Sequence, residues 1–77
     1  MDLKAIVTTT ATTQALLVDG TERLQVSSIT IVEFVVELED ASGIEIPNAE
    51  MRAENFESVS TVVHMLERLR AGPGLAK

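Results

Sequence analysis

Apolar and polar positions recur at helical spacing through residues 27–40, and this stretch predicts the central helix of the chain. It opens with Ser27 and Ser28, whose side chains can accept hydrogen bonds from the free N–H groups of a helix's first turn. The helix is therefore expected to begin at one of these two serines. The apolar residues that follow fall on two faces. The face expected in the core holds Ile31, Phe34, Val35, Leu38 and Ala41, and a second strip, rotated away from it, holds Ile29, Val32 and Val36.

The same stretch is rich in β-branched residues, which makes a strand the alternative interpretation. However, it shows no alternation of period two, and its 14 residues exceed the usual strand length of roughly 5–6 residues. We therefore favour the helix.

Two further helices are predicted, one on each side of the central one. The first lies within residues 3–17, although five threonines weaken it because branched side chains lose freedom in a helix. Its pattern consists of Leu3, Ile6, Val7, Ala11, Gln14, Leu16 and Leu17. The last helix covers residues 59–70, with Ser58 as its N-cap and with Arg68 and Arg70 near the negative end of its dipole. Its apolar stripe is the clearest in the chain and consists of Val59, Val62, Val63, Leu66 and Leu69.

The segments between these helices carry turn and link signals. Asp19-Gly20 marks a turn in a loop over residues 18–27, in which Leu24 and Val26 are expected to point inward. Gly43 is expected to end the central helix in a left-handed conformation, and residues 44–47 form an extended link before Pro47. Asn48 is expected to cap a short helical turn over residues 49–53, and Phe56 to fill the core from a loop.

The fold class predicted from this order is all-α. We expect a small bundle of three main helices plus one short helix, with a long loop between the first two main helices. Residues 1–70 are expected to form a single domain, and residues 71–77, which include two glycines and a proline, a flexible C-terminal tail.

Composition narrows the classes of function. The chain has 77 residues and no cysteine, so it can form one small domain without disulfides or thiolate chemistry. Its net charge of −6 disfavours nucleic acid as a partner and favours basic proteins. No apolar run approaches the roughly 20 residues that span a bilayer, and the N-terminus lacks the layout of a signal peptide. We expect a cytoplasmic monomer that binds neither nucleic acid nor membrane.

The residues offer little support for catalysis or for metal binding. His64 is the only histidine and falls beside the apolar stripe of the last helix, so a surface position is favoured. A hydrolase that used Ser28 and His64 would need a third, orienting group. No metal-ligand spacing and no phosphate-cradling glycine loop occurs, and we expect neither catalytic nor metal-binding residues.

Acidic residues are concentrated in the second half of the chain. Eight acids against one base, Arg52, lie between residues 33 and 57. Three of them, Glu33, Glu37 and Asp40, flank the second apolar strip of the central helix. An apolar patch with a charged rim is typical of an interaction surface, whereas scattered acids alone indicate a solvated face, and both interpretations stay open.

Three ordered segments resemble the acyl carrier protein family. They are Ser-Ser-Ile-x-x-Val-Glu-Phe-x-x-x-Leu-Glu-Asp from residue 27, Gly-Ile-Glu-Ile-Pro from residue 43, and Glu-Asn-Phe-Glu-Ser-Val from residue 54. The resemblance covers roughly residues 16–69, and it implies that Ser28 receives 4′-phosphopantetheine. It also places Ile29, Val32, Glu33, Val36, Glu39 and Asp40 on the helix that partner enzymes recognise, and Glu37 lies on the same face.

The resemblance implies a non-catalytic, stand-alone acyl or aminoacyl carrier that holds intermediates as thioesters, of the kind used in polyketide or nonribosomal-peptide metabolism. Its expected partners are a phosphopantetheinyl transferase, a loading ligase or acyltransferase, and downstream biosynthetic enzymes. Ser27 stands where the family usually has aspartate, and Ile29 where it has leucine. The departure at Ser27 keeps an alternative open, an unmodified interaction module that binds a partner through its acidic second helix.

Overall fold

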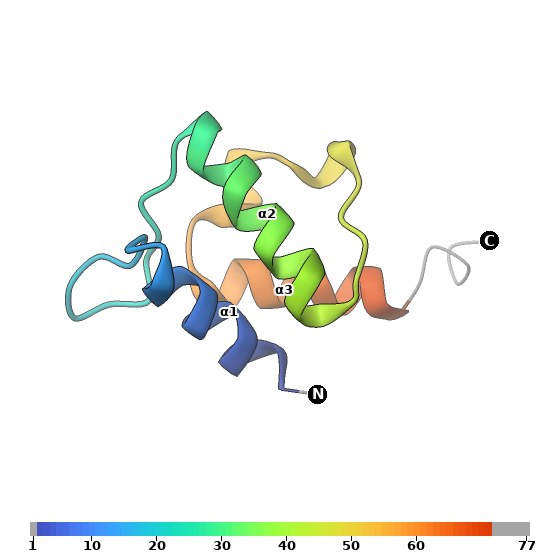
Figure 1. The fold of residues 1–77 in the computed structure, drawn as a ribbon, viewed down its shortest axis with the longest axis horizontal. Coiled ribbons are helices and arrows are strands. Elements are labelled where there is room, and N and C mark those ends of the chain that lie inside the picture. Colours follow the sequence, from blue (N-terminus) through green and yellow to red (C-terminus); the bar gives the residue numbers. More distant parts are fainter. Residues whose placement is uncertain (1, 72–77) are drawn as a thin grey trace.

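The chain folds as a small all-α bundle, as the sequence predicted (Figure 1). The computed structural model describes residues 2–71. Within them lie three α-helices, α1 (Leu3–Thr13), α2 (Ser28–Ser42) and α3 (Val59–Ala71), and two short 3-10 helices, η1 (Asn48–Glu50) and η2 (Ala53–Phe56). Over these residues no β-strand forms, and the extended segments make only the isolated bridges Leu17–Leu24 and Arg23–Ser58.

Helix α1 is shorter than the sequence predicted. It begins after Asp2, whose Oδ1 accepts a hydrogen bond from the Ala5 N–H at 3.2 Å, and it ends at Thr13. Ala15 then takes a left-handed conformation with φ of 57°, which breaks the helix before the two leucines. Leu16 still reaches the core, at 3% exposure, and Leu17 pairs with Leu24 across the bridge. The leucines thus contribute to packing from the loop.

Helix α2 presents the predicted core face with one change. Phe34, Val35 and Leu38 are buried and Ile31 is half-buried, but Ala41 is exposed, so its placement in the core was wrong. The buried residue in the last turn is Ser42, four positions after Leu38. Its hydroxyl donates to the Leu38 carbonyl at 2.6 Å and accepts from the Ile44 N–H at 3.1 Å, which makes its burial possible. Gly43, with φ of 71°, ends the helix as predicted.

The segment from α2 to α3 contains two 3-10 helices where one short helical turn was predicted. Asn48 begins η1 but does not cap it, because Pro47 holds the N-cap position and no side chain bonds there. Phe56 is fully buried as predicted, but it projects from η2 and not from a loop. In Figure 1 this segment runs back toward the upper part of the view, where α2 begins.

Helix α3 begins with a reciprocal cap. The Ser58 Oγ accepts from the Thr61 N–H at 3.2 Å, and the Thr61 Oγ1 accepts from the Ser58 N–H at 3.0 Å, which confirms the predicted N-cap. The predicted stripe faces the core, together with Met65, which the stripe had left out. The helix extends to Ala71, one residue beyond the prediction, and residues 72–77 of the predicted tail lie outside the described residues.

The core lies where α1 packs against both α2 and α3 and where η2 packs against α3. Phe34 of α2 meets Phe56 of η2 edge to face, with ring centroids 6.2 Å apart. Leu24 and Val26 of the long loop are half-buried against this core, as predicted. The arrangement leaves the first turn of α2 and one side of that helix facing outward.

Candidate functional site

Ser28 is the first residue of α2 and is exposed. Ser27 precedes it as the N-cap. The Ser27 Oγ accepts from the Thr30 N–H at 3.3 Å, and the Ser27 N–H donates to the Thr30 Oγ1 at 2.6 Å. None of the side-chain hydrogen bonds found over residues 2–71 uses the hydroxyl of Ser28. Of the two serines, Ser27 is engaged in capping, and Ser28 offers its hydroxyl to solvent.

The first turn of α2 suits an anion on Ser28. The N–H groups of Ser28 and Ile29 have no acceptor within the helix, and the positive end of the helix dipole lies there. No acidic side chain lies in this first turn. A phosphodiester on the Ser28 oxygen would therefore meet free donors and no nearby carboxylate of the helix. The residues present fit the phosphate end of a phosphopantetheine group.

Ser27 also explains how the helix starts without the aspartate that acyl carrier proteins, which the sequence resembles, usually have at this position. Serine and aspartate are both strong N-caps, because each places a side-chain oxygen within reach of a first-turn N–H. The reciprocal bonds with Thr30 add a second cap contact. The local backbone at Ser28 is thus held in place, while the negative charge of an aspartate is missing.

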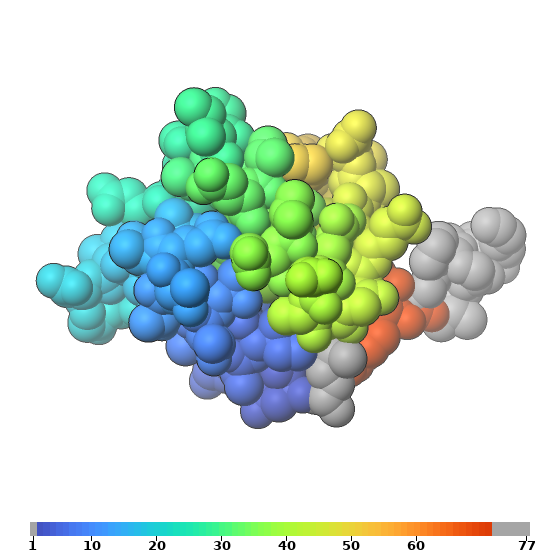
Figure 2. Space-filling model, in the orientation of Figure 1, coloured from blue at the N-terminus to red at the C-terminus, as the bar shows by residue number. Residues whose placement is uncertain are grey.

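The second apolar strip of α2 lies on the surface. The exposed fractions of Ile29, Val32 and Val36 are 73%, 51% and 57%. We call these three residues the apolar strip. Figure 2 shows α2 in green, open to solvent between α1 in blue and the segment after residue 43 in yellow.

Acidic side chains border the apolar strip. Glu33, Glu37 and Asp40 are all exposed, and we call them the acidic rim. A hollow between the end of α1 and α2 is lined by Gln14, Val32, Glu33, Val36 and Glu37. It is bounded on one side by Gln14, whose Nε2 donates to the Glu33 carbonyl at 3.3 Å. Apolar walls beside two carboxylates form a surface that matches a basic, amphipathic partner side chain.

Glu39 differs from the other acids of the predicted recognition set. It is half-buried, and its Oε2 accepts a hydrogen bond from the Ile46 N–H at 2.8 Å. Ile46 is itself buried at 5% exposure. Glu39 therefore fastens the extended link of residues 44–47 to α2, a contact that the sequence did not reveal.

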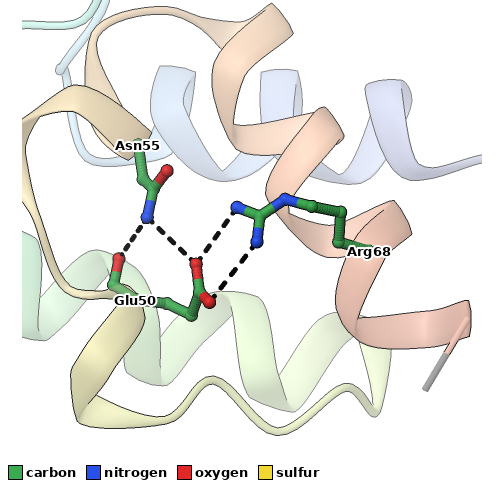
Figure 3. Close-up of polar contacts among 3 residues, drawn as sticks. All are labelled: Glu50, Asn55 and Arg68. Atoms are coloured by element: carbon green, nitrogen blue, oxygen red, sulfur yellow. Dashed lines mark hydrogen bonds and ion pairs between the residues drawn. The ribbon is translucent and has the colours of Figure 1, made fainter. Parts of the chain in front are cut away.

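Glu50 is a second acidic residue that makes structural contacts. The Nη2 of Arg68 on α3 lies 3.1 Å from the Glu50 Oε1, and Asn55 donates to the Glu50 carbonyl and carboxylate at 2.7 and 3.1 Å (Figure 3). The hydrogen bond from Arg68 holds the pKa of Glu50 below its usual value of 4.5, against a smaller opposite effect of burial. This cluster joins η1, η2 and α3, and it identifies Asn55 and Arg68 as structural residues.

His64 does not come together with Ser28. It is exposed on α3 and lines a small hollow with Lys4, Val59, Ser60 and Val63. Within residues 2–71 no hydrogen bond joins His64 to Ser28, and the hydrolase alternative gains no support. In the same residues no group of three or more histidine, aspartate or glutamate side chains is placed to hold a metal ion.

Within residues 2–71, no helix combines the length and the apolar character needed to cross a bilayer. Comparisons of the chain with known protein families, with curated proteins and with solved structures found no match. The features that point to a function are therefore the three segments that begin at residues 27, 43 and 54, and the geometry at Ser28 and along α2.

Proposed function

We propose that this chain is a stand-alone acyl or aminoacyl carrier protein that is modified on Ser28 with 4′-phosphopantetheine. The observation that carries the proposal is the exposed, unengaged hydroxyl of Ser28 at the first position of α2, next to a serine that caps the helix. Its support from sequence is the set of three ordered segments that resemble acyl carrier proteins. Neither a local base nor a pocket is needed at Ser28, because a transferase would supply both.

Each residue at the helix start has a separate task in this proposal. Ser28 provides the oxygen that bears the phosphodiester. The N–H groups of Ser28 and Ile29 stabilise its negative charge, and Ser27 keeps the first turn in shape through Thr30. The bound group supplies the thiol on which cargo is held as a thioester, which the chain cannot provide because it has no cysteine.

The exposed side of α2 serves as the surface that partner enzymes recognise. The acidic rim would steer basic partners by long-range attraction, and the apolar strip would supply contact area once the partner is in place. The partners proposed are a phosphopantetheinyl transferase, a loading ligase or acyltransferase, and later enzymes of a polyketide or nonribosomal-peptide type of pathway. We propose that the protein is cytoplasmic and that it is a monomer. A monomer leaves both Ser28 and α2 accessible to each partner enzyme in turn.

The experiment is co-expression with a promiscuous phosphopantetheinyl transferase, followed by intact-mass measurement. The parent chain is expected to gain the mass of one phosphopantetheine group, and Ser28→Ala is expected to gain none. Ser28→Ala is a suitable control because an alanine at an exposed first position of a helix leaves the cap at Ser27 intact. A parent chain that stays unmodified, or a Ser28→Ala variant that is modified, contradicts the proposal.

The second candidate is an unmodified interaction module that binds a basic partner through α2. Two observations favour it: the apolar strip is exposed, and Ser27 lacks the negative charge that carriers usually present before the modified serine. This candidate predicts that the chain remains unmodified in the co-expression experiment and yet binds a protein through α2. Val32→Ala would then weaken binding, whereas Ser28→Ala would leave it unchanged.

A further inference from the structure

Helix α1 has an exposed side that carries no charge. Ala5, Thr9, Thr12 and Thr13 are all exposed, and residues 5–18 include no acidic or basic residue. The solvent-facing side of a helix usually carries charged residues, which keep a protein surface soluble. The threonines do not compensate by favouring the helix, because their branched side chains weaken it. The proposed carrier function gives this side of α1 no role.

The uncharged side of α1 borders a groove against α2. The two helices run antiparallel, with α1 rising to the left in Figure 1 as α2 descends to the right. A hollow lined mainly by apolar atoms lies between the start of α1 and the end of α2. Its lining consists of Ala5, Ile6, Thr9, Thr10 and Ala41. The hollow described above, which Gln14 and Glu37 border, lies at the other end of α1. We call the surface that extends from Ala5 and Ala41 to Gln14 and Glu37 the α1–α2 seam.

The α1–α2 seam offers negative charge and hydrogen-bond acceptors. Glu33 and Glu37 are exposed on its α2 side, and neither α2 nor residues 5–18 contain a lysine or arginine. The Oε1 of Gln14 is buried without a hydrogen-bond partner among residues 2–71, and its Nε2 makes only a long bond of 3.3 Å to the Glu33 carbonyl. Rotation of this amide turns the oxygen toward the hollow. The complementary group is a cation with several N–H donors, as in the guanidinium of arginine.

The α1–α2 seam also faces away from Ser28. Glu37 follows Ser28 by nine residues, which turns it about 180° around the helix axis and moves it about 14 Å along that axis. Ala41, at the far end of the seam, follows Ser28 by 13 residues, about 20 Å along the axis. A protein that lies on the seam therefore leaves Ser28 accessible on the opposite side of α2.

We propose that the α1–α2 seam binds an arginine-bearing helical segment of a partner protein while Ser28 stays accessible to a second protein. The small side chains of Ala5, Thr9 and Ala41 let the partner helix approach closely. An arginine of that helix enters the hollow between Gln14 and Glu37, where it meets the carboxylate and the amide oxygen. This inference goes beyond the proposed function, and it holds whether or not Ser28 is modified.

The probe is a synthetic alanine-rich helical peptide, about 15 residues long, with arginines four residues apart on one side. The same peptide with glutamate in place of arginine is its control. In a titration of the isotopically labelled protein, the largest amide shifts are expected at Ala5, Thr9, Gln14, Glu37 and Ala41. Binding should weaken as salt is added. No shifts with the arginine peptide, equal binding of the glutamate peptide, or shifts confined to the apolar strip would overturn the proposal.

Two variants place the site on both helices. Thr9→Arg on α1 and Glu37→Lys on α2 should each weaken binding of the arginine peptide at least about fivefold. Both positions are exposed, so the fold should persist, and circular dichroism checks it. Glu67→Lys adds positive charge at an exposed position on α3 and should change the affinity less than about twofold. An equal loss in all three variants would mean that the attraction is not specific to the seam.

Access to residue 28 is measured separately. Ser28→Cys introduces a unique thiol, since the chain has no cysteine, and N-ethylmaleimide should label it at the same rate with and without saturating peptide. Labelling that is several-fold slower with peptide would contradict simultaneous access. Sedimentation of the protein alone should show a monomer, and a dimer that Thr9→Arg disrupts would mean that a second copy occupies the seam, against the proposal. None of these measurements uses a transferase, so failure of enzymatic modification would count against the carrier function alone.

Discussion

Ser27 and Thr30 cap each other at the start of α2, with the Ser27 N–H donating to the Thr30 Oγ1 at 2.6 Å and the Thr30 N–H donating to the Ser27 Oγ at 3.3 Å. This pair leaves Ser28 between two engaged residues, with its own side chain exposed. The geometry at the proposed modification site is thus maintained by its neighbours. Because the uncharged Ser27 caps the helix, the structural role of position 27 does not require a negative charge.

Ser27→Ala is expected to lower the stability of the protein, whereas Ser27→Asp is not. Alanine removes the cap and should lower the free energy of unfolding by about 1 kcal/mol. Aspartate can cap Thr30 equally well and places a negative charge at the positive end of the helix dipole, so stability should be unchanged or slightly higher. Urea denaturation measures both. A Ser27→Ala variant as stable as the parent would show that the cap contributes nothing.

The Ser27→Asp variant also tests whether the charge before Ser28 affects the rate of modification. If transferases recognise the charge usually found before the modified serine, Ser27→Asp should be modified faster than the parent under matched conditions. The readout is the modified fraction over time by intact mass. Equal rates for parent and Ser27→Asp would mean that the transferase does not sense this charge.

The contact between Glu39 and Ile46 predicts different roles for two acids on α2. Glu39→Ala removes the acceptor for the Ile46 N–H, a contact of 2.8 Å, and should cost about 1–2 kcal/mol of stability. Glu37→Ala, at an exposed position on the same helix, is the matched control and should change stability by less than about 0.5 kcal/mol. Chemical denaturation of both variants tests this. Equal effects would mean that the link of residues 44–47 does not depend on Glu39.

The pair of Glu50 and Arg68 predicts a component of stability that depends on pH. The folded pKa of Glu50 lies below its usual value of 4.5, so its contribution is present above that value and is lost as the pH falls through the lower folded pKa. Because the Arg68 side chain is 56% exposed, solvent screens the pair, and the contribution should be about 0.5 kcal/mol. Glu50→Gln should lose this component, so its stability should fall less than that of the parent on acidification. Parallel pH profiles of the two proteins would contradict the prediction.

The acidic rim and the apolar strip should affect partner binding in different ways. Charge reversal at Glu33 or Asp40 should slow association with the transferase several-fold, most at low salt, because rim charges act through long-range attraction. Val36→Ala should instead speed dissociation, with a loss of about 1 kcal/mol, roughly fivefold in affinity, at any salt concentration. Binding kinetics at two ionic strengths separate the two effects.

Glu67→Lys provides the control for this comparison, since it makes the same charge change at an exposed position on α3. It should slow association less than reversal on α2. If reversal of the rim leaves association unchanged at both ionic strengths, the rim is a solvated face, and recognition must use another surface.

Local signals in the sequence predicted most of the fold. The caps at Ser27 and Ser58 and the helix end at Gly43 depend on residues within a few positions, and such contacts can be inferred from spacing. The exposed apolar strip followed in the same way, because it lies on the side of α2 opposite to Phe34 and Leu38.

The failures concern positions that depend on distant partners. Ala15 takes a left-handed conformation where the chain turns to bring Leu17 beside Leu24. The helical spacing of residues 3–17 does not predict this turn, because the turn depends on a contact with residue 24. Glu50 and Arg68 are 18 residues apart, and Glu39 meets Ile46 only because the link folds back on α2. In the sequence Glu39 and Glu50 were two of eight acids between residues 33 and 57, whereas the tertiary contacts give both of them structural partners.

Site mapping of the modified protein distinguishes Ser28 from Ser27 as the residue that bears phosphopantetheine. Tryptic cleavage after Arg23 and Arg52 gives one peptide that contains both Ser27 and Ser28, so fragmentation of this peptide must locate the added group. Phosphopantetheine is expected on Ser28 alone. A group found on Ser27, or no group on this peptide after exposure to an active transferase, would contradict it.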